Sequence, residues 1–255
     1  MGELNFFLGL QVKQTPKGTM MSQQKYIKEL LKRFDMEGSK IIDTLIATAT
    51  RLDMDEPGSL VNETMYRGII GSLLYLIASK PDIIFRVGLR ARFQSNPKES
   101  RLKAAKRILR YLKGTQDLVL YYPSEDNFDL IGHADADYAG YLVDRKSTSG
   151  MVQILGSCLI SWGTRKQNSV ALSTAKAEYV ASASCCAQLL WIKQQLEDFG
   201  MFSDCVPLLD NVEKGHIYMK FCSTKDQIAD IFTKVDTHDD YRAKKHLMHY
   251  TLVKR

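Results

Sequence analysis

The sequence predicts an α+β protein, with a mostly helical N-terminal region followed by a mixed β-sheet that packs against one long helix. In residues 22–36 and 63–115, apolar side chains recur at intervals of three and four residues, which is the spacing of one helix face. After Pro123 short extended runs replace this pattern, and a helical pattern returns only at Thr174. Strands that are segregated from helices along a chain are typical of α+β architecture. We therefore expect one module over residues 1–120 and a second from residue 121 onward.

The N-terminal module is expected to begin with a hairpin. Two apolar runs, residues 6–12 and 19–21, flank the turn-forming residues 15–18. Residues 37–62 carry turn-forming residues and scattered charge, which predict a long, loosely ordered connector. Four helices are expected in this module: one capped by Ser22 with the stripe Tyr26, Ile27, Leu30, Leu31 and Phe34, then residues 63–79, residues 82–93, and one that runs from the capping residue Asn96 to Gly114.

The second module is expected to combine short strands with a long helix. Gly200 is a natural stop for that helix, and a last short strand should end on Asp210. The predicted strands cover residues 128–135, 150–155, 158–162, 169–172 and 206–209, and the predicted helix covers residues 174–199.

Charge is spread unevenly over these modules. The net charge is +8 over residues 1–120 and −2 over the rest, and residues 86–113 hold ten Lys and Arg against one acid. A helix pair this basic on one face favours phosphate binding, although a solvated helix surface has a similar composition. The expected nucleic-acid-binding residues are Arg86, Arg90, Arg92, Lys103, Lys106, Arg107, Arg110 and Lys113.

Three acids of the second module are candidate metal ligands. Asp135 ends a predicted strand, Glu178 lies in the first turns of the long helix, and Asp210 ends the last strand. Carboxylates that are brought together by one sheet and its packing helix suit Mg²⁺, and paired Mg²⁺ ions can support phosphodiester cleavage. Acids at strand ends and helix starts are also common as solvated or capping residues, so spacing alone leaves both interpretations open.

Several other classes of function are disfavoured. The five cysteines form no Cys-x-x-Cys pair, so neither a disulfide framework nor a zinc site is supported. We expect no membrane span, because the most apolar stretch, residues 69–78, is far shorter than a bilayer requires. We see no signal or transit peptide, which makes the cytoplasm the default expectation.

Six segments resemble known sequences. FLGLQV (7–12), YRGIIGSLLYL (66–76) and KRILRYLKGT (106–115) resemble the region that follows the palm in copia-type reverse transcriptases of LTR retrotransposons. DRKSTSG (144–150), SVALST (169–174) and ADIFTK (229–234) resemble the ribonuclease H region of the same Pol polyproteins, in a style typical of plants. The resemblance runs in order from residue 1 to about residue 234.

The resemblance implies a role for each module. Residues 1–120 would hold the hairpin that positions the primer terminus and the thumb and connection helices that grip the duplex. Residues 121–234 would be a ribonuclease H-like domain, followed by a divergent tail over residues 235–255. Asp135, Glu178 and Asp210 would be the first three catalytic carboxylates, which in the family hold two Mg²⁺ ions and cut the RNA strand of an RNA–DNA hybrid.

Two departures from the family pattern limit this implication. The chain begins after the Tyr-x-Asp-Asp signature of the polymerase, so polymerisation is not expected. After Asn211 the family has roughly forty further residues that supply a fourth carboxylate, and here Val212 follows directly. We therefore expect a ribonuclease H-type domain that is truncated at its sheet edge and inactive as it stands, with an RNA–DNA hybrid or duplex and the rest of a Pol polyprotein as its partners. The alternative is a non-catalytic nucleic-acid-binding remnant that uses the basic helix face.

Overall fold

The computed structural model describes residues 4–45, 58–124, 127–141, 143–201 and 226–233, and the backbone of residues 206–207 and 217–218. The chain divides into two compact units, with the boundary after Ser124. Helices and antiparallel sheets occur together, which confirms the α+β class. Asp210, the junction after Asn211 and the expected tail over residues 235–255 lie outside the described residues. No helix within the described part of the chain is long and apolar enough to span a bilayer.

The first unit contains an antiparallel sheet of four strands in the order β1-β2-β3-β4. The expected hairpin is confirmed, because β2 and β3 pair from Thr15↔Gly18 to Gln11↔Ser22. The edge strand β4 was not expected, since it is separated from β3 by the whole helical region and is held there by pairing with β3. The strands are β1 (Phe6–Phe7), β2 (Leu10–Thr15), β3 (Gly18–Ser22) and β4 (Leu120–Pro123).

The helices of the first unit occur where the apolar periodicity predicts them, but two expected caps are wrong. Ser22 is the last residue of β3, so Gln23 precedes the first helix. Lys98, which forms an isolated bridge with Leu60, holds an extended conformation and replaces Asn96 as the residue before the last helix. The elements are α1 (Gln24–Arg33), α2 (Glu63–Leu76), η1 (Pro81–Ile83), α3 (Ile84–Ala91) and α4 (Glu99–Gly114).

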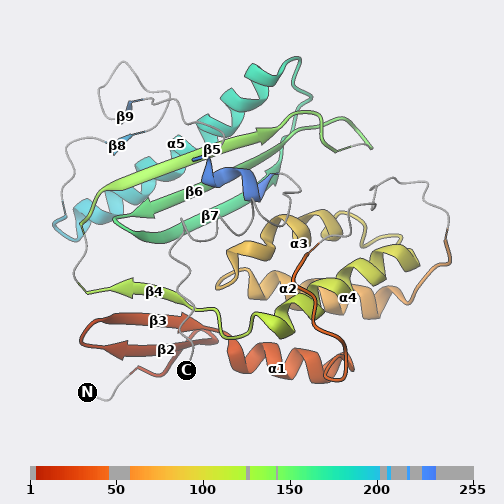
Figure 1. The fold of residues 1–255 in the computed structure, drawn as a ribbon. Helices are drawn as coiled ribbons and strands as arrows, with labels where there is room; N and C mark the ends of the chain where they lie inside the picture. The colour runs from red at the N-terminus through yellow and green to blue at the C-terminus, as the bar shows by residue number, and fades with distance from the viewer. Residues whose placement is uncertain are drawn as a thin grey trace. The chain divides into compact units, whose positions relative to one another are not determined.

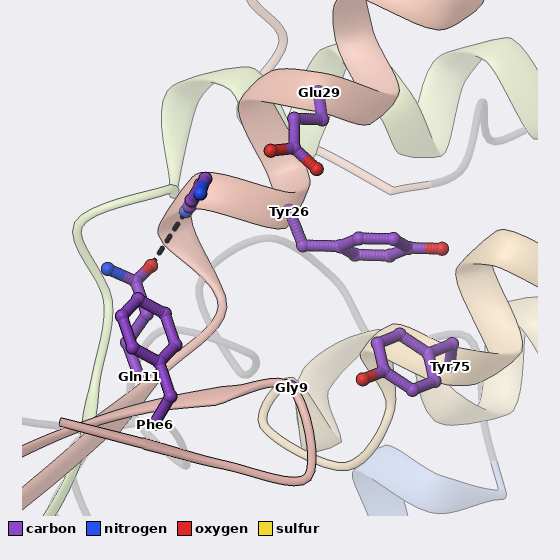
Figure 2. A pocket seen from close by; sticks show the side chains of 7 residues that line it. Phe6, Gly9, Gln11, Tyr26, Glu29 and Tyr75 are labelled. Atoms are coloured by element: carbon purple, nitrogen blue, oxygen red, sulfur yellow. Dashed lines mark hydrogen bonds between the residues drawn. The ribbon is translucent and has the colours of Figure 1, made fainter. Parts of the chain in front are cut away.

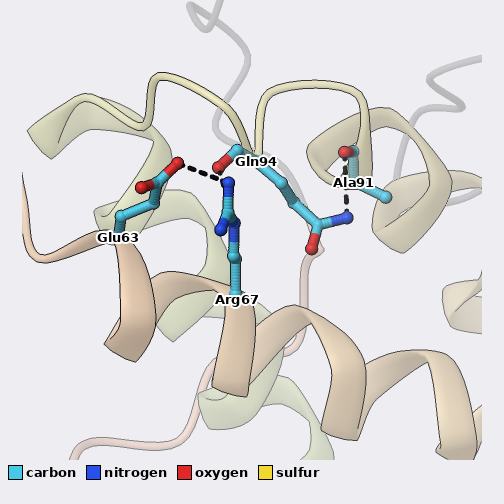
Figure 3. Close-up of polar contacts among 4 residues, drawn as sticks. All are labelled: Glu63, Arg67, Ala91 and Gln94. Carbon is cyan, nitrogen blue, oxygen red and sulfur yellow. Dashed lines mark hydrogen bonds and ion pairs between the residues drawn. The ribbon is translucent and has the colours of Figure 1, made fainter.

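Polar contacts join these helices to the turns between them. Figure 3 shows Arg67 of α2, whose Nη2 lies 2.6 Å from Oε1 of Glu63, one turn earlier. Its Nε donates to the carbonyl of Gln94, after α3, at 3.2 Å. The Gln94 amide in turn donates to the carbonyl of Ala91. This chain of contacts fixes the turn that follows α3 against α2.

The second unit is a three-stranded antiparallel sheet in the order β5-β6-β7, followed by a long helix. The strands β5 (Leu130–Asp137), β6 (Thr148–Leu155) and β7 (Cys158–Lys166) lie between α5 (Thr174–Asp198) on one face and η3 (Ile228–Phe232) on the other (Figure 1). Ser173 caps α5 through its hydroxyl, which accepts from the Lys176 amide at 3.2 Å. The strand expected over residues 169–172 is wrong, because these residues do not form a strand. Ala171 packs into the core, while Leu172 is exposed.

The last expected strand is described only in part. Residues 206 and 207 form β8 (Val206–Pro207), which pairs in parallel with β9 (Ile217–Tyr218). The remaining residues of the expected strand, 208 and 209, lie outside the described part of the chain.

Gly150 allows η3 to lie close to the sheet. A Cβ at this position of β6 would come within 2.7 Å of the Thr233 methyl group and 2.9 Å of the Ala229 carbonyl oxygen. Because Gly150 pairs with Asp135, the closest approach of η3 falls beside the first candidate metal ligand.

Candidate functional site

Asp135 lies near the end of β5 with its side chain on the face that η3 covers. Residues 130, 134 and 136 of the same strand belong to the clusters that pack against α5, and alternation along the strand turns Asp135 to the opposite face. Its carboxylate accepts a hydrogen bond from the hydroxyl of Thr233, a buried residue that directly follows η3. Thr233 belongs to the segment 229–234, which resembles the ribonuclease H region. Its hydroxyl therefore contacts the Asp135 carboxylate from the side of η3.

A buried acid in η3, Asp230, was missed by the sequence analysis. The Thr233 hydroxyl also lies 3.2 Å from the carbonyl oxygen of Asp230, and Asp230 is only 3% exposed. Acids are rarely buried without a partner. The apolar neighbours Ala229 and Ile231 were the sequence signal that could have indicated a buried acid at position 230. Asp230 is an additional candidate residue in η3.

Glu178 lies on the second turn of α5 and its side chain is exposed. The preceding residue, Ala177, is fully buried and belongs to a cluster with Ala136, the neighbour of Asp135 in β5. The backbones that carry the two acids are thus packed together, while Asp210 lies outside the described residues. Within the described ranges no group of three Asp, Glu, His or Cys is placed to hold a metal ion. Convergence of the three acids stays a prediction.

His133 lies two residues before Asp135 and gives this unit a pH dependence. Burial lowers the pKa of His133 below its ordinary value of 6.5. As the pH falls below 6.5, His133 therefore binds a proton more readily in the unfolded chain than in the folded chain. We expect the stability of the unit to be fully present above about pH 6.5 and to decrease as the pH falls toward the folded pKa.

The measurement is denaturant unfolding at pH 7.5 and 5.5, followed by the fluorescence of Trp162 and Trp191, which both lie in the second unit. His133→Gln should make the two unfolding midpoints more nearly equal. If the variant loses as much stability between pH 7.5 and 5.5 as the unsubstituted chain, the His133 imidazole does not contribute to the pH dependence.

The basic stretch of the first unit is less exposed than the sequence suggests. Arg86 and Arg90 of α3 are 6% and 3% exposed, so neither contributes to a surface that phosphates can reach. The Arg90 carbonyl accepts from the Tyr66 hydroxyl at 3.0 Å, and burial raises the pKa of Tyr66 to about 12. α3 is buried because α2 and α4 both pack on it. Arg92, just after α3, is half-buried.

Two basic side chains of α4 donate hydrogen bonds to residues of the expected connector. Arg107 donates to the carbonyl and the hydroxyl of Thr44 at 3.0 and 2.6 Å. Lys113 donates to the carbonyls of Glu37 and Ser39, the latter at 2.7 Å. Hence α4 holds residues 37–44, the first part of the expected connector, through charged side chains.

The remaining expected cations are Lys103, Lys106 and Arg110, which we call the α4 basic face. Lys103 is exposed and pairs with Glu99 one turn earlier at 2.8 Å. Lys106 and Arg110 are half-exposed on the same helix. These three positions follow each other at intervals of three and four residues, so they lie along one helix face.

A pocket of about 460 Å³ lies beside the expected hairpin of the first unit. Figure 2 shows the rings of Tyr26 and Tyr75, whose centroids are 4.9 Å apart, next to Gly9 of the β1–β2 turn. Gly9 has φ +79°, and a Cβ there would collide with the Tyr75 hydroxyl, which donates to the Leu8 carbonyl at 3.1 Å. The glycine of the FLGLQV segment is therefore required for this turn to close on α2.

Comparisons with known proteins identify relatives of the chain. No protein-family model matches it, and no solved structure matches it. It is 34% identical to the retrovirus-related Pol polyprotein from transposon RE1 of Arabidopsis thaliana, over 91% of this chain and 18% of the relative. It is also 34% identical to the retrovirus-related Pol polyprotein from transposon TNT 1-94 of Nicotiana tabacum, over 79% of this chain and 16% of the relative.

A shorter relative is matched over most of its length. An uncharacterized mitochondrial protein of Arabidopsis thaliana is 31% identical over 75% of this chain and 79% of that protein. Against the two polyproteins, the chain spans less than a fifth of the relative. The chain is similar to one part of the retrovirus-related Pol polyproteins of plant transposons.

Proposed function

We propose that the second unit is a ribonuclease H-type domain whose carboxylates Asp135, Glu178 and Asp210 serve hydrolysis of the RNA strand of an RNA–DNA hybrid. The observation that carries this proposal is the packing of Ala177 on Ala136, which brings the backbones beside Glu178 and Asp135 together across the α5–β5 interface. A three-stranded antiparallel sheet followed by a long helix supports the same assignment.

The residues present fit Mg²⁺ by the chemistry of their donors. Mg²⁺ prefers oxygen ligands and is bound in proteins through one or two carboxylates, with water and substrate oxygens completing its shell. Asp135 and the exposed Glu178 supply such groups. Bound there, Mg²⁺ would polarise a phosphodiester and stabilise the charge that develops during its hydrolysis.

Other residues of the chain would hold the candidate metal-binding carboxylates in place. Thr233 restrains the Asp135 carboxylate through its hydroxyl, and Gly150 lets η3 approach closely enough for this contact. Glu178 would act from an exposed position, where a substrate backbone can reach it. The segment of roughly forty residues that the family has after Asn211 would supply a further carboxylate, so we propose that the chain is catalytically deficient without it. Hybrid cleavage with that segment restored, compared with Asp135→Asn, tests the proposal.

A second candidate function is nucleic-acid binding by the first unit, through the α4 basic face. The observation that favours it is that Lys103, Lys106 and Arg110 stay accessible while the other cations of α3 and α4 are buried or bound to the connector. Such a face binds phosphates without reading sequence, and its affinity falls steeply with salt.

Charge reversal of the α4 basic face should weaken binding of an RNA–DNA hybrid. Each phosphate contact contributes about 0.9 to the slope of log affinity against log salt, so losing all three should reduce that slope by about 3. The measurement is fluorescence anisotropy of a labelled hybrid at several salt concentrations.

The control reverses Lys25, Lys28 and Lys32 of α1, which are exposed in the same unit and change the net charge equally. Equal losses from both triple variants would show that overall charge, and not the α4 basic face, drives binding.

A further inference from the structure

We propose that Gln167 is a positioning residue that holds the Glu178-bearing turn of α5 against the strand pair that carries Asp135. The inference rests on the proposed metal site and names a residue that neither the motifs nor the resemblance assigned. Gln167 directly follows β7 and is 5% exposed, although its side chain is polar. A buried amide is retained at a cost unless its hydrogen bonds are used, so its contacts indicate its role.

The side chain of Gln167 makes two hydrogen bonds with one nitrogen. Its Nε2 donates to the Ser149 hydroxyl at 3.0 Å and to the Ala177 carbonyl at 2.8 Å. Its backbone amide donates to the Ser147 carbonyl at 2.9 Å, which fixes the residue beside β6. Both hydrogens of one planar amide are thereby used, so a change in one contact moves the other.

The two acceptors lie next to the two candidate ligands. Ser149 precedes Gly150, the residue that pairs with Asp135 across the β5–β6 ladder. Ala177 precedes Glu178 and is fully buried. The Gln167 amide thus connects Ser149 of β6 to Ala177 of α5. This connection sets the position of Glu178 relative to Asp135.

Gln153 provides a matched control. It is also a buried glutamine between the sheet and α5, and its Nε2 donates to Sγ of Cys185 at 3.2 Å. Cys185 lies two turns further along α5 than Glu178, so this amide stabilises the same interface away from the acids. Among the residues that the structure describes, both glutamines keep an amide oxygen that accepts no hydrogen bond, and they differ in position and in the acceptors of their Nε2.

The test compares Gln167→Met with Gln153→Met in the full chain, because methionine keeps the length of the side chain and removes both donors. Mn²⁺ is titrated alone, and NMR line broadening of the Asp135 and Glu178 amides reports its affinity. Loss of a residue that orients metal ligands typically weakens affinity about 10- to 100-fold. We expect at least a 10-fold loss in Gln167→Met, about 2-fold or less in Gln153→Met, and faster amide exchange over residues 174–181 in Gln167→Met only.

Three outcomes would overturn the inference. Unchanged Mn²⁺ affinity in a folded Gln167→Met chain would show that the amide is only structural, and equal losses in both variants would indicate general loosening of α5. Absence of Mn²⁺ broadening in the unsubstituted chain would overturn the proposed metal site itself, and the inference with it. If Gln167→Met does not fold, Gln167→Asn carries the same expectation, because its shorter side chain cannot reach both acceptors.

Discussion

In a hybrid-cleavage assay with Mg²⁺, we expect this chain to be at least about 100-fold slower than a version with the family-like segment restored between Asn211 and Val212. The restored segment adds a carboxylate, and the loss of one group that stabilises developing charge typically costs two to three orders of magnitude. The measurement is the rate at which a labelled RNA strand is cut in an RNA–DNA hybrid, with both proteins at equal concentration.

Two substitutions in the restored chain identify the site. Asp135→Asn removes a ligand charge while it keeps the size of the side chain, and should abolish cleavage. Asp144→Asn is the matched control, because Asp144 is a partly exposed acid of the same unit that pairs with Lys166. Rapid Mg²⁺-dependent cleavage by the unrestored chain would contradict the proposed deficiency, and cleavage that survives Asp135→Asn would contradict the assignment of the site.

The second large effect concerns the stability of the first unit, where Lys80 is a fully buried cation. Its Nζ donates to the carbonyls of Thr115 and Leu118, at 2.6 and 3.1 Å, in the turn that follows α4. Lys80→Met keeps most of the volume but leaves both carbonyls without this charged donor. We expect the free energy of unfolding to fall by about 3–6 kcal/mol, because two hydrogen bonds to a charged group are lost and each contributes about 1.5–3 kcal/mol.

Urea unfolding followed by far-ultraviolet circular dichroism measures this loss. Lys103→Met is the matched control, since the Lys103 side chain is 72% exposed on α4 and its pair with Glu99 should contribute less than about 1 kcal/mol. A loss below about 1 kcal/mol in Lys80→Met would mean that water replaces the ammonium group at these carbonyls.

Much of the secondary structure followed from local patterns. The β2–β3 hairpin required only two apolar runs around a Pro-Lys-Gly turn, and the end of α5 required only the stop at Gly200. β4 was not predictable in this way, because its four residues become a strand only by pairing with β3 about one hundred residues earlier. The stretch 169–172 shows the reverse case: its composition suits a strand, but no described strand pairs with it.

Residue types and their order identified by themselves which groups are candidates for chemistry. Asp135 at a strand end, Glu178 early in a helix and the cations of α4 were all identifiable from the sequence, because charge and periodicity are local properties. Accessibility was decided by the tertiary structure. Packing of α2 and α4 on α3 buries Arg86 and Arg90, and docking of η3 brings Thr233 to Asp135 across 98 residues of chain. Burial and long-range hydrogen bonds depend on which surfaces meet, and one-dimensional spacing does not contain that information.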